Sequence, residues 1–115
     1  MPRKSKKKNP FLGRWRITAM EQWDKDFIDE EEEGFFKFRK GGQGEFHFGN
    51  VQGSIDYDIE SIEEKQRLEF SWEGNSEMDD ANGRGLAHIE DDGYMFGKIT
   101  FHLGDRSWFR AKRKK

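Results

Sequence analysis

The chain has 115 residues and a formal net charge of −2; only 32% of its residues are hydrophobic, yet 15% are aromatic. Because each aromatic ring buries a large apolar area, a few rings can fill a small core, and a disordered chain would lack them. The absence of Cys excludes disulfides and Cys-ligated zinc and is typical of a reducing compartment. No apolar segment follows the basic N-terminus, so we expect a cytoplasmic protein without a secretory or membrane segment.

Basic residues gather at the two ends of the chain. Five lie within residues 1–8 and five within 110–115, where no acidic residue occurs, so residues 9–109 carry eleven basic and 23 acidic side chains. We interpret residues 1–8 and 114–115 as basic tails, the first of them disordered, around a single domain at 9–113. Solubilising tails are favoured over a grip on nucleic acid, because the acidic body would repel the phosphates that the tails attract.

Alternating apolar and polar residues predict an all-β fold, an eight-stranded antiparallel up-and-down meander barrel. The expected strands are residues 11–20, 34–40, 44–49, 52–60, 66–73, 83–90, 94–103 and 107–113. Between the first two, the spacing of Trp23, Phe27 and Ile28 predicts a short helical segment within 21–33, packed over one barrel end. The acidic run 29–33 is expected to be a solvated loop, and the polar stretch 74–82 the longest loop outside the tails.

A short motif opens the first predicted strand. After a turn at Pro10 and Phe11, Gly13-Arg14-Trp15 resembles the Gly-x-Trp signature of the calycin barrels, which include lipocalins, fatty-acid-binding proteins and avidin-type proteins. The resemblance implies that a basic residue of the last strand covers the buried Trp, and Arg110 is assigned this role rather than Arg113. Gly13, Trp15 and Arg110 would then close one barrel end.

The chain departs from lipocalins in being shorter and in lacking their signal peptide and disulfides, so a compact, avidin-like barrel is the nearer comparison. It also resembles short bacterial proteins of uncharacterised function that share the Gly-Arg-Trp start and a Phe-Ser-Trp-Glu-Gly segment, here residues 70–74. That second resemblance implies no activity.

A barrel of eight strands can be filled by its own side chains or can hold one small ligand. Small inward residues (Gly85, Ala87, Gly97 and Ala111) would face bulky Phe side chains, which could leave a cavity or simply fill a tapered interior. The candidate interior and mouth residues for a small apolar or aromatic ligand are Trp23, Phe38, Phe46, Phe70, Trp72, Ala87, Phe101 and Trp108.

No catalytic or metal-binding pattern emerges, and we expect a non-enzymatic monomer without a cofactor. His47, His88 and His102 fall on polar strand faces without metal-ligand spacing. Outward acids on neighbouring strands (Asp56, Asp58, Glu69 and Glu73) suit either solubility or a basic protein partner. Two functions therefore stay open: a small-ligand binder, or a protein-interaction module that uses the acidic face, with the basic tails as auxiliary contacts to polyanions.

Overall fold

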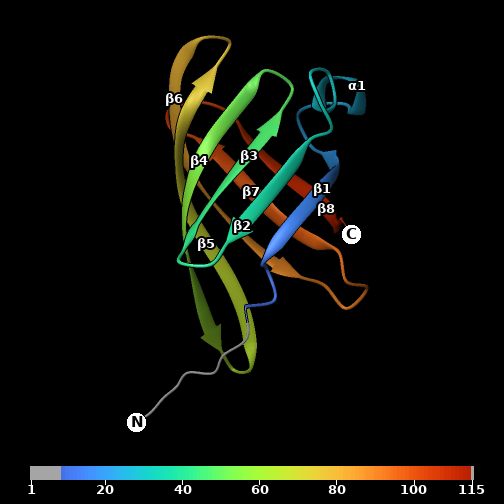
Figure 1. Ribbon diagram of the computed structural model, residues 1–115, viewed down its shortest axis with the longest axis vertical. Coiled ribbons are helices and arrows are strands. Elements are labelled where there is room, and N and C mark those ends of the chain that lie inside the picture. Colours follow the sequence, from blue (N-terminus) through green and yellow to red (C-terminus); the bar gives the residue numbers. More distant parts are fainter. Residues whose placement is uncertain (1–8, 115) are drawn as a thin grey trace.

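The computed structural model describes residues 9–114, so the tail predicted at residues 1–8 and Lys115 lie outside the described residues. Eight antiparallel strands follow one another around a closed barrel in meander order, and β1 pairs with both β2 and β8 (Figure 1). The predicted fold class is confirmed. The strands are β1 (Gly13–Met20), β2 (Phe35–Arg39), β3 (Gln43–Phe48), β4 (Val51–Ile62), β5 (Lys65–Ser76), β6 (Asp79–Ile89), β7 (Met95–Phe101) and β8 (Arg106–Arg113).

The predicted helical segment is a single turn, α1 (Lys25–Ile28), at one end of the barrel (Figure 1). It begins at Asp24, whose carboxylate accepts a hydrogen bond from the Phe27 backbone N–H at 2.9 Å and so caps an unsatisfied donor. Ile28, the last residue of the helix, is buried and anchors the helix to the barrel. The helix has only four residues, so most of the segment 21–33 in which it was predicted is not helical.

The prediction of a loop at residues 74–82 is wrong. β5 continues to Ser76 and β6 begins at Asp79, so only Glu77 and Met78 form the turn. Both have positive φ, 52° and 74°, as a two-residue type I′ hairpin requires. Such turns ordinarily contain Asn or Gly. Because Glu77 and Met78 are neither, the sequence does not indicate this turn.

Two glycines lie where the backbones of neighbouring strands come very close. A Cβ placed on Gly74 would lie 1.9 Å from the Gln52 carbonyl oxygen, and one on Gly83 would lie 1.8 Å from the Thr100 carbonyl oxygen. Neither position tolerates a side chain without a shift of the neighbouring strand. These glycines therefore mark places where the backbones of neighbouring strands approach closely.

Packed aromatic rings fill the centre of the barrel. Phe36 is fully buried, and its ring lies 4.4 Å from that of Phe109, 5.5 Å from Phe46, 6.0 Å from Phe70 and 6.2 Å from Phe38, centroid to centroid. These separations are typical of favourable ring pairs. The chain thus builds its small core from a few large side chains.

The opening motif closes one end of the barrel. Trp15 is 1% exposed, and its indole N–H donates to the Phe11 carbonyl oxygen at 2.9 Å. The Arg113 guanidinium lies 4.3 Å above the Trp15 ring and donates to the backbone carbonyls of Pro10 and Leu12. Gly13 has φ 109°, and a Cβ there would lie 3.3 Å from an Arg113 nitrogen, so its lack of a side chain makes room for the guanidinium.

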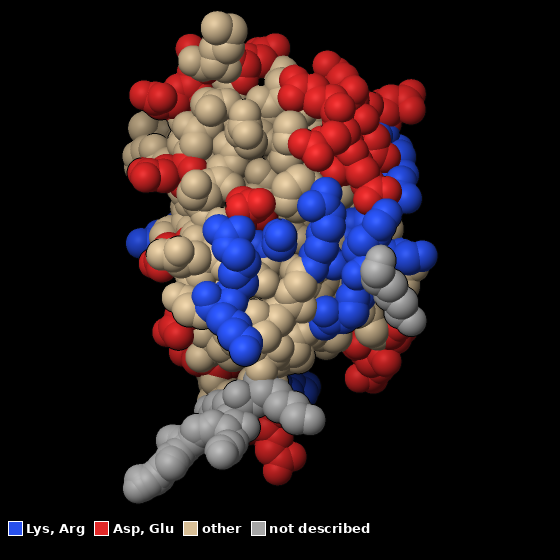
Figure 2. All heavy atoms as spheres, viewed as in Figure 1, with Lys and Arg blue, Asp and Glu red and all other residues tan. Residues whose placement is uncertain are grey.

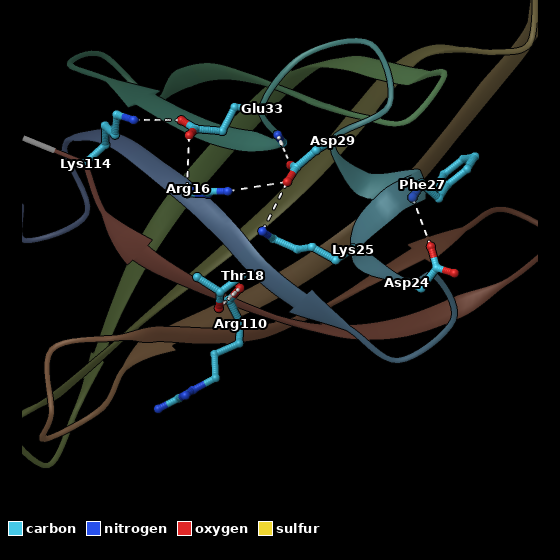
Figure 3. Close-up of polar contacts among 10 residues, drawn as sticks. Arg16, Thr18, Asp24, Lys25, Phe27, Asp29, Glu33, Arg110 and Lys114 are labelled. Carbon is cyan, nitrogen blue, oxygen red and sulfur yellow. Dashed lines mark hydrogen bonds and ion pairs between the residues drawn. The ribbon is translucent and has the colours of Figure 1, made fainter.

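The assignment of Arg110 to this position is wrong. Trp15 pairs with Arg113 across β1 and β8, whereas Arg110 lies opposite Ala19, beyond an irregularity in the register. The Arg110 side chain extends away from β1 (Figure 3). Its guanidinium lies 4.0 Å from the centre of the Tyr94 ring and pairs with Asp92 at 2.7 Å.

Replacement of Arg113 by alanine should lower the free energy of unfolding by about 1–2 kcal/mol, because a cation–π contact and two charge-assisted hydrogen bonds are lost. Equilibrium urea unfolding followed by Trp fluorescence measures the loss. The neighbouring Lys112→Ala, which removes an exposed cation without these contacts, is the matched control. Equal losses in the two variants would contradict the closure role of Arg113.

Candidate functional site

The predicted interior residues belong to a packed core. Phe38, Phe46, Phe70 and Ala87 are each no more than 4% exposed. A Cβ on Gly85 would lie 2.2 Å from the tip of the Phe70 ring, and one on Gly97 would lie 2.7 Å from that of Phe109. The small residues therefore accept the ends of the large rings, which favours a filled interior over a binding cavity.

Three of the predicted mouth residues come together at the barrel end beside α1. The Trp23 ring lies 5.8 Å from that of Phe101, which in turn lies 5.0 Å from Trp72. Trp72 is buried, and its indole N–H donates to the Thr100 carbonyl oxygen at 3.2 Å. Trp108 does not join them, because it lies on the outer side of β8, where its ring stacks on that of Phe96 at 5.9 Å.

A hollow of about 430 Å³ opens at this end of the barrel, and we call it the rim cavity. Trp23, Phe27 and Phe101 form part of its apolar lining, whereas Glu77, Asp80, Asp105 and His102 supply polar groups. It is a recess at the mouth rather than a tunnel into the core. This is where a small ligand would meet the predicted mouth residues.

A longer depression crosses the outer faces of β4, β5, β6 and β7, and we call it the outer groove. It consists of two adjoining hollows of about 380 and 760 Å³ that share Asp56, Ser71, Arg84 and Thr100. These side chains alternate with the buried residues of their strands and so point away from the core.

The two sides of the outer groove carry opposite charge. All four acids predicted for an acidic face line it, namely Asp56, Asp58, Glu69 and Glu73, whereas Arg84 and Lys98 line the opposite side. Glu69 pairs with Arg67 at 3.0 Å, but the described ion pairs within 4 Å include none for Asp56, Asp58 or Glu73. The β4–β5 side of the groove thus has three carboxylates without a neutralising neighbour.

The acidic run at 29–33 is a loop, as predicted, with residues 30–32 exposed, but both of its ends are tied to the barrel. Arg16 pairs with Asp29 at 3.4 Å and Glu33 at 3.3 Å, and Lys114 pairs with Glu33 at 2.9 Å (Figure 3). Lys25 adds a contact to Asp29 at 3.2 Å. The basic C-terminal segment therefore folds back on the acidic body at this point.

His47 is also held by the acidic run and is less exposed than its predicted outward position implies. Its side chain is 13% exposed, and its two ring nitrogens lie 2.8 Å from Glu32 and 3.1 Å from Glu31. In the described part of the chain, no group of three or more His, Asp or Glu side chains is arranged to hold a metal ion.

These ion pairs lower the pKa of two carboxyl groups. Burial raises the pKa of Asp29, but the Gly34 N–H and the Lys25 and Arg16 cations outweigh it, so the pKa lies below its ordinary value. A hydrogen bond from Lys114 is the main reason that the pKa of Glu33 is lowered. The stability from both pairs is therefore fully present above about pH 5 and lost as the pH falls through the lowered folded-state pKa values.

The midpoint of urea unfolding should accordingly fall as the pH decreases below about 5, and Glu33→Gln together with Asp29→Asn should flatten that part of the profile. Urea titrations at a series of pH values between acid and neutral measure it. Glu30→Gln, which alters an exposed acid of the same run without a described ion pair, is the control. A double variant with the same acid dependence as the parent would show that these pairs contribute nothing.

Comparison with known proteins assigns no family. No protein-family model matches the sequence, and a search of curated proteins finds no significant match. Within residues 9–114, no helix has the length and apolar character needed to cross a membrane.

Proposed function

We propose that this barrel is a non-catalytic binding module whose outer groove holds a basic segment of a partner protein. The observation that carries the proposal is the row of unneutralised carboxylates on the β4–β5 side of the groove, Asp56, Asp58 and Glu73. The groove extends over the outer faces of four strands, so an extended or loop segment can lie in it. Lys and Arg side chains of that segment would pair with these carboxylates.

The arrangement of the acids costs stability, which favours a role in binding. Asp58 and Glu69 lie directly opposite each other on paired strands. Like charges at such positions destabilise a sheet, by roughly 0.2–1 kcal/mol per pair. A bound cation would relieve this repulsion, and the negative side of the groove would also steer a basic partner toward it.

Replacement of Asp56 and Asp58 by asparagine should weaken binding of a fluorescent oligoarginine peptide about tenfold at low salt, because two charge contacts are lost. The same change should raise the free energy of unfolding slightly, since the Asp58–Glu69 repulsion is removed. Fluorescence anisotropy and urea unfolding give the two readouts.

Glu63→Gln with Glu64→Gln is the matched control, because it removes the same charge from the exposed β4–β5 turn outside the outer groove. Its affinity for the peptide should stay close to that of the parent. If both double variants lose affinity equally, overall charge governs the binding and the groove is not its site.

A second candidate is a small apolar or aromatic ligand in the rim cavity. The specific observation in its favour is the cluster of Trp23, Phe27 and Phe101 around a hollow of about 430 Å³ beside α1. A ligand at one mouth of the barrel would suit the calycin-like character that Gly13, Trp15 and Arg113 share with ligand-carrying barrels. We rank it second because these rings already pack on one another.

A further inference from the structure

The outward side chains of β6, β7 and β8 form a regular array of aromatic and basic residues, which we call the aromatic–basic array. The strand register places them in three rows across the sheet: Arg84, Thr100 and Arg106; Leu86, Lys98 and Trp108; His88, Phe96 and Arg110. We propose that this array binds single-stranded nucleic acid. The array shares Arg84, Leu86, Lys98 and Thr100 with the basic side of the outer groove, whereas Phe96, Trp108, Arg106 and Arg110 lie outside the groove. Variants of Trp108 therefore test this inference separately from the outer-groove proposal.

The aromatic members provide stacking surfaces on the outside of the barrel. Phe96 and Trp108 stand on neighbouring strands, with an angle of 25° between their ring planes and a centroid distance of 5.9 Å. Both remain partly exposed, and Leu86 beside them is 42% exposed. Exposed apolar side chains gathered in one place commonly mark a binding surface. Aromatic side chains on a sheet surface stack on unpaired bases, which have a π-face whatever their sequence.

The charges of the array fit a phosphate backbone. Its nine side chains include four cations and no carboxylate, and Arg84, Lys98 and Arg106 have no ion pair within the described residues. Acids border the array on each side: Asp92 pairs with Arg110, and Glu90 lies 3.7 Å from His88. Glu69 on β5 lies opposite Leu86, and Glu21 accepts a hydrogen bond from the Trp108 backbone N–H at 3.3 Å. Three cations are therefore free to contact phosphates while bases lie on the rings.

Basic residues continue the array around the barrel. Lys112 on β8 lies opposite Arg16 on β1, and Arg14 lies opposite Lys37 on β2. Figure 2 shows the resulting band of Lys and Arg across the face where β1 and β2 lie, with acidic residues gathered near α1. A nucleic-acid strand that continues from the array across β8 would thus meet further cations.

The size of the array determines how many nucleotides it can contact. Three strands and five residue positions span roughly 10 by 13 Å, enough for about two or three stacked nucleotides. A duplex offers its bases edge-on in the grooves, so two rings on a sheet surface would gain no stacking from it. The array therefore favours single strands over duplexes.

Binding of fluorescein-labelled oligothymidine and oligouridine to the full chain, followed by anisotropy over a salt series, tests the proposal. We expect affinity to fall with salt and the single strands to bind more tightly than a duplex of equal length. Trp108→Ala should weaken binding about tenfold, the effect of losing one stacked base. Trp108→Leu and Lys98→Gln, which keep more of the packing, should show the same direction if Trp108→Ala proves unstable.

Two controls separate the array from other cationic segments of the chain. Replacement of Lys4, Lys6, Lys7 and Lys8 by Gln removes tail charge and leaves the array intact, and Asp56→Asn with Asp58→Asn removes acids of the outer groove without altering a side chain of the array. Oligonucleotide binding by both should keep its preference for single strands and its dependence on Trp108. No binding, equal affinity for the duplex, or affinity unchanged in Trp108→Ala and Lys98→Gln but lost in the tail variant would overturn the proposal.

Discussion

Replacement of Phe36 by alanine should lower the free energy of unfolding by about 3–5 kcal/mol, the largest loss expected for a single truncation in this chain. The ring is fully buried and contacts four other Phe rings, so its removal forfeits both apolar burial and ring pairing. Domains of this size are stable by only about 5–15 kcal/mol, so the variant should be partly unfolded at physiological temperature. Thermal and urea unfolding followed by circular dichroism measure the loss.

Two variants calibrate that result. Phe36→Leu keeps most of the buried apolar area and should cost less than the alanine variant. Leu103→Ala truncates a side chain that is 95% exposed and should change stability by no more than about 0.5 kcal/mol. A Phe36→Ala loss as small as that of Leu103→Ala would show that the rings do not form the core of the barrel.

Replacement of Gly85 by valine should destabilise the barrel by about 1–3 kcal/mol or prevent folding, because the added side chain enters occupied space. A Cβ at Gly85 would lie 2.2 Å from the tip of the Phe70 ring and 2.8 Å from the Lys98 carbonyl oxygen, so both a ring and a strand would have to move. Urea unfolding gives the change in free energy. The measurement tests directly whether the small residues of β6 leave empty space inside the barrel.

Leu86→Val is the matched control for Gly85→Val, since it alters the next residue of the same strand on the exposed outer face. It should leave stability nearly unchanged. If Gly85→Val were as stable as the parent, the barrel would contain room beside Phe70, and an internal ligand site would regain its place ahead of the outer groove.

Period-2 alternation was sufficient to predict the barrel, because inward and outward residues differ so strongly in polarity along β3, β4 and β5. Alternation did not show where the strands end at two hairpins. The two-residue turns at Glu63-Glu64 and Glu77-Met78 have positive φ without Gly or Asn, so nothing in their residue types marks them as tight turns. Pairing with the neighbouring strands determines their conformation instead.

The misassignment of Arg110 has a similar origin. Alternation shows which residues face outward but does not show which residue of β8 lies opposite Trp15. That depends on the register, which shifts between Ile17 and Ala19. Arg113 lies at the end of β8, where its side chain can reach over the barrel end.

The surface sites were only partly predictable. The outward positions of Asp56, Asp58, Glu69 and Glu73 followed from alternation, but their place in one groove depends on how four strands lie side by side, which alternation does not show. Phe96 was not singled out from the sequence, because its stacking on Trp108 depends on the β7–β8 register.

We expect partners to bind on the outside of a filled barrel, and an NMR titration tests this most directly. The isotopically labelled chain would be titrated with the oligoarginine peptide and, separately, with a small hydrophobic fluorophore. We predict that the peptide shifts backbone amide signals of Asp56, Asp58 and Ser71, while methyl and ring signals around Phe36 and Phe70 stay unchanged with either probe. Shifts confined to Trp23, Phe27 and Phe101 would favour the rim cavity, and large shifts at Phe36 and Phe70 with none in the outer groove would contradict the claim.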